Sequence, residues 1–285
     1  MYRLVAFAYR DKPPLEYLDQ HLYEVSIYMY PLLINKRPSI KFIGILAGIL
    51  HDIGKSIDIY QKCILYNPET KACSYTGHEV FSALLTIKII DIDSIPLNIV
   101  KDLATFLSCN DDDAKKALIK VIAISIISHH QAMGSPYDRL ESFIYRITKK
   151  YRSTKLEVCR SVIEVIEEAI KRAKEVLQED YLYIKLDPKG IDYVEELCNN
   201  ALREGRQQII DRILSELRKA LALPSETYSE KLILLEKFIT GSLIIADLYI
   251  AGLRRGETIS RPLFNYLNKM YRYYSSTYLP QPINT

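Results

Sequence analysis

The chain has no tryptophan, and none of its five cysteines forms a C-x-x-C pair. An odd cysteine count without such pairs argues against a zinc ribbon and against the disulfide framework of a small secreted protein. A disulfide between Cys63 and Cys73 stays open for a hyperthermophilic source, where intracellular disulfides occur. The abundance of Ile, Lys, Glu and Tyr fits such a source.

Long hydrophobic runs are missing as well. The N-terminus, MYRLVAFAYRDKPP, lacks an apolar core followed by a small-residue cleavage site, so no secretory signal peptide is predicted. The longest apolar runs, near residues 43–50, 121–128 and 242–253, are too short or too interrupted to span a bilayer. We therefore expect a soluble cytoplasmic protein that makes no membrane contact.

Neither sign of charge is in large excess. The chain has 38 Lys and Arg against 35 Asp and Glu, a net charge of +3. This balance creates no overall field that demands an anionic partner, so nucleic-acid contact would depend on local patches. Hydrophobic residues make up 48% of the 285 residues, enough for a large core. There is no internal repeat, and we expect one domain over residues 1–285.

Helical spacing of apolar residues dominates the chain, which predicts an all-α fold. A short extended lead-in is expected at 2–9, and a loop with short helical pieces at 55–74. Ser39 is the expected cap of the helix that ends at His51. Helices are predicted over residues 15–33, 39–51, 76–90, 96–107, 114–130, 137–151, 155–183, 191–223, 229–254 and 261–275.

The most informative stretch is 46–56, which reads LAGILHDIGKS. An apolar helical run ends in adjacent His51 and Asp52, just before Gly54. Both side chains can bind a metal, and a buried aspartate is costly unless it is paired or coordinates a cation. A metal bound by this pair would need further ligands from other parts of the chain.

The same stretch contains Gly54-Lys55-Ser56, the ending of a phosphate-binding P-loop. Five residues rather than four separate Gly48 from Gly54, and a helix precedes the motif where a strand is required. We therefore reject nucleotide binding of that type. Lys55 is interpreted as a cation beside a metal site, placed to hold a phosphate oxygen. The alternative is a solvated lysine at a helix end.

Histidine is scarce, and every histidine lies on an apolar helical face or at the end of a predicted element. The five are His21, His51, His78, His129 and His130. Any one of them alone could be a core or capping residue. Together with a carboxylate, imidazoles select Mn, Fe, Co, Ni or Zn, and a carboxylate-rich site also admits Mg.

Asp247 interrupts an otherwise apolar stretch, SLIIADLYIAGL. An unpaired carboxylate there would cost several kcal/mol, roughly 2–7 for an uncompensated polar group, so it needs a partner. The partner could be Arg254 or Arg255, or Asp247 could lie on a narrow polar face. The five histidines favour a metal instead.

Taken in order, His21, His51-Asp52, His78, His129-His130 and Asp247 resemble the HD phosphohydrolase superfamily. More narrowly, the chain resembles the CRISPR-associated HD nuclease, the stand-alone nuclease subunit that works with a separate helicase in type I interference. The local signatures are HDIGKS, GHE and SHH. The resemblance implies a helical bundle that holds two divalent metals, with most ligands in residues 1–150 and a helical extension over 151–285.

Carried over by position, the resemblance implies two ligand sets that share a bridging Asp52. One set is His21, His51, Asp52 and Asp247, and the other is Asp52, His78, His129 and His130. Asp192 and Asp211 compete with Asp247 for its place. Asp52 and Lys55 are the expected catalytic residues, and Lys55 and Ser56 the expected substrate contacts.

The resemblance implies metal-dependent hydrolysis of phosphodiester bonds in DNA, most readily single-stranded, with RNA left open. A separate helicase and a CRISPR effector complex are the expected partners, since the chain has no Walker motif. One alternative is a phosphohydrolase that acts on nucleotides or cyclic nucleotides. Another is a binding subunit whose metal site is structural or decayed.

Three segments could contact a nucleic-acid strand: the basic clusters 146–152 and 171–174, and the aromatic and basic stretch 270–278. Solvated helix faces and packed tyrosines are the competing explanation for all three.

Overall fold

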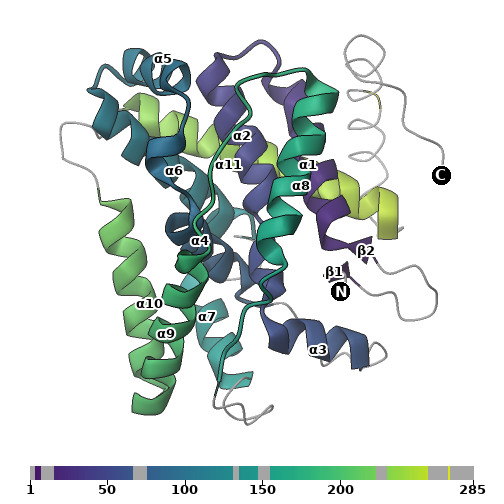
Figure 1. Cartoon of the computed structure of the whole chain (residues 1–285), viewed down its shortest axis with the longest axis vertical. Helices are drawn as coiled ribbons and strands as arrows, with labels where there is room; N and C mark the ends of the chain where they lie inside the picture. The colour runs from purple at the N-terminus through teal and green to yellow at the C-terminus, as the bar shows by residue number, and fades with distance from the viewer. Residues whose placement is uncertain are drawn as a thin grey trace.

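The computed structural model describes residues 4–7, 16–66, 76–130, 135–146, 155–222, 230–255 and 269. The predicted all-α fold is confirmed, since helices make up nearly all of the regular structure in these ranges (Figure 1). The exception is an antiparallel pair of short strands, β1 (Val5–Phe7) and β2 (Glu16–Tyr17). No helix among the described residues is long and apolar enough to cross a membrane.

The helices follow one another with short connections. In chain order they are α1 (Leu18–Leu33), α2 (Pro38–Leu50), the 3-10 turn η1 (Ile53–Ser56), α3 (Asp58–Tyr66), α4 (His78–Ile89), the 3-10 turn η2 (Ile92–Ser94), α5 (Leu97–Leu107), α6 (Asp111–Ser128), α7 (Pro136–Tyr145), α8 (Val162–Leu177), α9 (Lys189–Glu204), α10 (Arg206–Leu221) and α11 (Glu230–Arg255).

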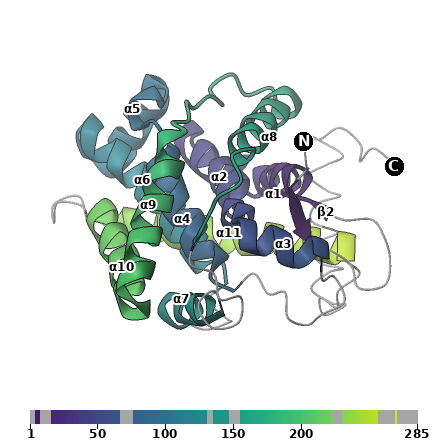
Figure 2. The ribbon, with the colours of Figure 1, turned by 60° about the horizontal axis from the view of Figure 1, so that its bottom comes forward.

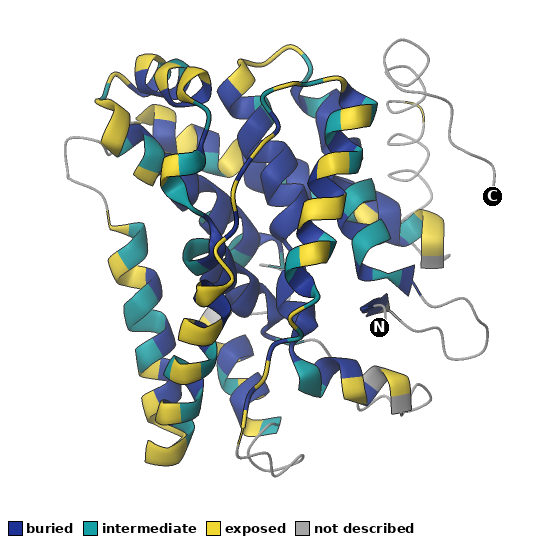
Figure 3. Cartoon of the chain, viewed as in Figure 1, coloured by how far each residue is buried: buried dark blue, intermediate teal, exposed yellow. Residues whose placement is uncertain are grey.

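Helix α2 lies at the centre of the bundle. Every residue from Phe42 to Leu50 is buried, as expected for a helix that is apolar nearly all round. Helices α1, α6 and α11 pack against it, and α9 and α10 lie side by side against α4 (Figure 2). Buried side chains fill the middle of the molecule, while exposed ones line the outer faces of α5, α8 and α10 (Figure 3).

Two predicted helices have different bounds in the structure. The helix predicted over 155–183 begins only at Val162, because the residues before it are extended and pair with the chain just after Asp52. The amide of Asp58 donates to Glu157 O at 2.9 Å, and the amide of Cys159 donates to Ser56 O at 2.9 Å. These backbone hydrogen bonds satisfy groups that a longer helix would have used itself.

The helix predicted over 191–223 is two helices, α9 and α10. Gly205 separates them with φ of 128°, a backbone conformation that L side chains rarely adopt. Glycine at this position ends α9 and lets α10 pack back against it, as the figures show (Figure 2).

The predicted cap at Ser39 is wrong. Arg37 precedes α2, and Ser39 lies in the first turn, where its amide and hydroxyl donate to Asp102 at 3.1 and 2.6 Å. Cys63 is disulfide-bonded, and its expected partner Cys73 lies outside the described residues. The helix predicted over 261–275 lies outside them too, except for residue 269.

Two glycines allow backbones to approach closely around the HD stretch. A Cβ on Gly48 would lie 2.7 Å from Ser26 Cα, so this glycine lets α1 approach α2. A Cβ on Gly54 would collide with the backbone carbonyl of His78 and lie 2.8 Å from Ser82 N, so Gly54 lets η1 reach the start of α4. The Gly54 amide donates to Ser82 Oγ at 2.8 Å. Because of these contacts, three helices meet next to His51 and Asp52.

Gly54→Ala should therefore destabilise the fold by about 1–3 kcal/mol, since backbone atoms must move to admit the methyl group. The matched control is Gly241→Ala in α11, where an added Cβ meets nothing within 4 Å. That variant should be stabilised by about 0.5–1 kcal/mol, because alanine loses less entropy in a helix. Denaturant unfolding measures both values, and equal stabilities would contradict the close-approach role of Gly54.

Candidate metal centre

Two of the histidines end helices, and both are held in the same way. His51 follows α2 and His129 follows α6, where the last carbonyl groups of each helix lack intrahelical partners. The Nδ1 of His51 lies 2.8 Å from Gly48 O, and the Nδ1 of His129 lies 2.5 Å from Ile126 O. These hydrogen bonds place a proton on Nδ1, so both rings turn Nε2 to the centre of the bundle.

His21 reaches the same centre from the first turns of α1. Its Nε2 lies 3.3 Å from the Nε2 of His51. Its Nδ1 lies 2.9 Å from Oε1 of Glu16, the residue of β2 that comes just before α1. Both side chains are buried. In proteins, an imidazole that binds a metal commonly donates its other ring N–H to a carboxylate in this way.

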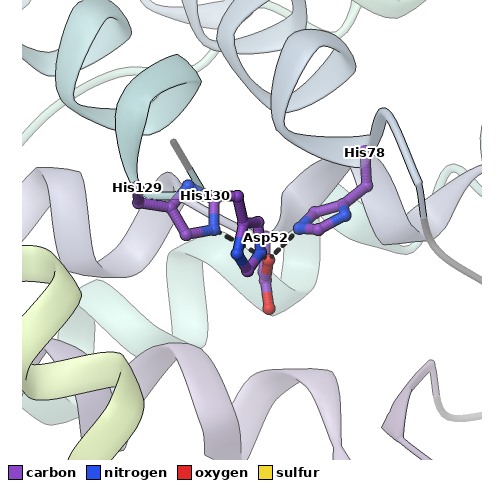
Figure 4. A group of neighbouring side chains, drawn as sticks. All are labelled: Asp52, His78, His129 and His130. Atoms are coloured by element: carbon purple, nitrogen blue, oxygen red, sulfur yellow. Dashed lines mark ion pairs between the residues drawn. The ribbon is translucent and has the colours of Figure 1, made fainter. Parts of the chain in front are cut away.

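His78 begins α4 directly after Gly77, whose φ of 87° turns the chain into the helix. His78 and the adjacent pair His129 and His130 face the Asp52 carboxylate from two sides (Figure 4). The centroids of the His78 and His130 rings are 5.1 Å apart. Residues far apart in the sequence thus converge on one carboxylate.

Asp52 lies between two groups of side chains and turns one oxygen to each. Oδ1 is 2.7 Å from His78 Nε2 and 3.9 Å from His129 Nε2. Oδ2 is 3.2 Å from His21 Nε2 and 3.4 Å from His51 Nε2. This is the geometry that a carboxylate bridging two cations requires.

The structure brings together every residue of the two ligand sets that the resemblance implies. Within each group, one ligand atom per residue lies within 4.8 Å of the others: Asp52, His78, His129 and His130 in one group, and His21, His51 and Asp247 in the other. Ligand atoms that share a cation at bond lengths of about 2.0–2.2 Å lie roughly 3.0–3.4 Å apart. The distances from His21 Nε2 to His51 Nε2 and to Asp247 Oδ1, both 3.3 Å, fall within that range.

Two buried atoms at the centre make no hydrogen bond with the described part of the chain: Oδ1 of Asp52 and Nε2 of His129. A buried polar atom without a partner costs free energy, about 1–3 kcal/mol each. A cation between these two atoms, 3.9 Å apart, would satisfy both. The donor set of imidazoles and carboxylates therefore fits a divalent metal ion.

The charges of the two groups differ. Burial alone would lower the pKa of His21, but hydrogen bonds to Asp247, Asp52 and Glu16 raise it well above its ordinary value. In the other group, burial and the neighbouring His51 lower the pKa of His129 to about 3, and burial likewise lowers the pKa of His130. The pKa of Asp52 lies well below its ordinary value, because His51, Lys55 and His78 outweigh the effect of burial.

Asp247 takes the position that the sequence assigned to it, and its competitors lie elsewhere. Its Oδ1 is 3.3 Å from His21 Nε2 and 3.7 Å from His51 Nε2. Asp192 pairs with Arg160 at the surface, and Asp211 accepts a hydrogen bond from Gln207. Arg254, an expected alternative partner of Asp247, pairs with Glu24 instead.

Lys55 and Ser56 have different surroundings. The Nζ of Lys55 is 2.5 Å from Oδ2 of Asp52, so Lys55 is buried beside the bridging carboxylate rather than solvated. Ser56 is fully buried, and its hydroxyl donates to Ile53 O at 2.6 Å. The structure gives no support to Ser56 as a substrate contact, because that hydroxyl braces η1 within the core.

Sequence reasoning missed two acidic residues of the centre, Glu16 and Glu79. Glu79 follows His78, and its Oε2 lies 3.5 Å from His78 Nδ1. Both of its oxygens also pair with Arg139 of α7, at 2.5 and 2.9 Å. The place of Glu79 beside His78 in the GHE signature was a usable signal, whereas nothing local marked Glu16.

The segments considered for strand contact are only partly described. On α8, the guanidinium of Arg172 lies over the ring of Tyr23, 4.1 Å from its centroid, which matches the packed alternative. Residues 147–152 and the stretch 270–278 lie outside the described residues.

If Asp52 bridges two cations, Asp52→Ala should lower the affinity for both metal equivalents, and Asp247→Ala should lower it for only one. The reason is that Asp52 contributes an oxygen to each group and Asp247 to one. Metal content after dialysis and calorimetric titration with Mn²⁺ measure the stoichiometry. Asp192→Ala, a change in a surface ion pair, serves as the control. Loss of a single equivalent in Asp52→Ala would contradict the bridge.

The two groups should also respond differently to pH. Imidazole must lose its proton before it binds a metal. Because the His21 pKa is raised, its proton is bound at neutral pH, and affinity at the His21 group should rise as pH increases toward that pKa. His129, with its pKa near 3, is a neutral imidazole in this range and has no imidazolium proton to release. Titrations from about pH 6 to about pH 9 should show greater proton release for one equivalent than for the other; equal release would exclude this asymmetry.

Comparison with known proteins returns no match: no protein-family model, no curated protein sequence and no solved structure is similar to this chain. The arrangement of the side chains itself fits a metal centre. Five imidazoles and two carboxylates come from α1, α4, α6, α11 and the turn after α2, and they meet at one buried point with one ligand atom each turned inward.

Proposed function

We propose that this chain is a metal-dependent phosphodiesterase of the HD type, a nuclease that hydrolyses DNA, preferentially single-stranded. The observation that carries the proposal is the placement of Asp52, which turns one carboxylate oxygen to each of two imidazole-containing groups. In this proposal the chain works in the cytoplasm with a separate helicase and a CRISPR effector complex. These are the partners that the sequence resemblance implies.

The chemistry needs a nucleophile and a way to offset charge on phosphate. A pair of divalent cations supplies both when bound, by lowering the pKa of a water ligand and by neutralising phosphodiester oxygens. Mn, Mg, Ni, Co, Fe and Zn are all compatible with a mixture of imidazole and carboxylate ligands. The buried histidines and Asp52 are the residues that would hold the two cations.

Lys55 is the residue of the chain best placed to act on the phosphate. Its Nζ contacts Asp52 Oδ2 at 2.5 Å, so its charge lies beside the bridging carboxylate. A fixed ammonium group in a buried site stabilises negative charge that develops on a phosphate oxygen more strongly than it would in water. Lys55 also steadies Asp52 before substrate binds, which keeps the carboxylate ionised and oriented.

A second candidate function, hydrolysis of nucleotides or cyclic nucleotides, is favoured by the depth of the site. His21 and His51 are fully buried, and the Asp247 side chain is 16% exposed. A site this deep suits a small phosphate ester, which needs a narrower opening than a strand does. The ligands alone do not separate the two functions, because both reactions break a phosphate ester bond.

One experiment separates the functions: incubation with Mn²⁺, Mg²⁺, Co²⁺, Ni²⁺, Fe²⁺ or Zn²⁺ and two substrate panels. The nuclease proposal predicts cleavage of single-stranded oligonucleotides, with RNA and duplex DNA as comparisons, and complete loss of cleavage in Asp52→Ala. Release of product from mononucleotides alone would favour the second candidate. A protein that binds metal but leaves both panels intact would support a binding subunit.

In the same assay, Lys55→Gln should lose only part of the activity, whereas Asp52→Ala should lose all of it. Turnover should fall by about 10²–10³-fold, the usual effect of removing one group that stabilises a developing charge. Metal stoichiometry should stay at the wild-type value, because Lys55 is not a ligand. A surface lysine of the following helix α3, Lys62, pairs with Asp58 and offers the control Lys62→Gln.

A further inference from the structure

The short N-terminal hairpin touches the candidate metal centre through one side chain. Glu16 lies on β2, is 6% exposed, and places Oε1 2.9 Å from His21 Nδ1. The Nε2 atom of the same ring faces His51, Asp52 and Asp247. Glu16 is therefore one side chain removed from the centre.

We propose that Glu16 is a positioning residue that acts on only one of the two metal groups, the one formed by His21, His51 and Asp247. The proposal rests on the metal-dependent function proposed above. A carboxylate acceptor on Nδ1 fixes the proton there, turns the Nε2 lone pair to the metal and makes that nitrogen a stronger donor. Without the acceptor the ring can rotate or adopt the other tautomer, in which Nε2 cannot bind a cation.

The other imidazoles are oriented differently, which makes the effect of Glu16 selective. His51 and His129 are held by carbonyl groups of their own helices. His78 has an acidic neighbour in Glu79, but that carboxylate shares both oxygens with the Arg139 guanidinium, which offsets its charge. Glu16 thus adds a carboxylate to the group that already contains Asp247, and leaves the three-histidine group unaltered.

The hairpin is built to hold Glu16 in place. Strand β1 pairs with β2, with Phe7 opposite Glu16, and the Leu18 amide donates to Leu4 O at 2.9 Å. A two-stranded hairpin is only marginally stable by itself, so it needs further contacts. Gln61 of α3 provides them.

The Gln61 side chain joins the hairpin to the turn that carries Lys55. Its Oε1 accepts from the Val5 amide at 2.9 Å, and its Nε2 donates to Val5 O at 2.9 Å and to Lys55 O at 2.7 Å. Gln61 is buried. The position of Glu16 is therefore coupled to η1, the turn next to Asp52, and the hairpin becomes part of the support of the centre.

The test uses the full chain and three variants, Glu16→Ala, Glu16→Gln and Glu24→Gln, titrated with Co²⁺ or Mn²⁺. Calorimetry gives the affinity of each equivalent, and the visible spectrum of Co²⁺ reports its ligands. Glu16→Ala should weaken one equivalent by about 10–100-fold and leave the other unchanged. Glu16→Gln keeps an oxygen acceptor and should recover most of the lost affinity. Glu24→Gln, on the helix that carries His21 but paired with Arg254, should behave as wild type.

Different outcomes overturn different claims. Unchanged affinities in Glu16→Ala, or equal weakening of both equivalents, would overturn the selective role of Glu16 and leave the proposed function standing. A wild-type chain that takes up no divalent ion would overturn the proposed function together with this inference. If Glu16→Ala loses helical circular dichroism, the comparison of Glu16→Gln with wild type decides. The proposal predicts a small residual loss of affinity at one equivalent and a shifted Co²⁺ spectrum, because the neutral amide is a weaker acceptor than the carboxylate. A purely structural role predicts two unchanged equivalents and an unchanged spectrum.

Discussion

The whole centre follows from one constraint: Asp52 is an ionised carboxylate with 2% of its surface exposed. Moving such a charge from water into a protein interior costs several kcal/mol unless positive charge and hydrogen bonds replace the water. The fold provides that replacement from all sides. Lys55 contacts one oxygen, and imidazoles from four separate segments surround both. The buried Asp52 carboxylate therefore needs positive charge close to it. Protonated imidazoles or divalent cations can supply that charge.

Several helices begin or end next to Asp52, and this arrangement brings the imidazoles to it. Helices α2 and α6 finish there, and α4 begins there. The free carbonyl groups at the ends of α2 and α6 orient His51 and His129, so the element that closes each helix also aims a donor atom. The negative ends of these two helix dipoles point at the centre and favour a cation further. Gly48 and Gly54 make the convergence sterically possible.

The sequence was sufficient for the helices and for the inward-facing histidines, because both leave local marks: a repeat of apolar residues, and scarce imidazoles at its ends. Asp247 was found because a charge in an apolar run is costly. Other features depend on contacts between distant segments and leave no such mark. The pairing of residues 157–159 with η1 overrode the helical pattern after Lys155. Asp102 drew Ser39 away from a capping role, and Glu16 reaches His21 only because β2 pairs with β1.

The two groups that share Asp52 have different donor atoms, and this difference affects which cations each group would bind. Beside Asp52, one offers His78, His129 and His130, while the other offers His21, His51 and the carboxylate of Asp247. The nitrogen-rich group suits borderline cations such as Ni²⁺, Co²⁺ and Zn²⁺, whereas the added carboxylate makes the other group more tolerant of Mn²⁺ and Mg²⁺. Because burial and neighbouring charges lower the pKa values of His129 and His130, these two imidazoles can bind a cation without first losing a proton. A cation held there would then repel the protons on His21 and His51 across the shared carboxylate, so filling the first position prepares the second.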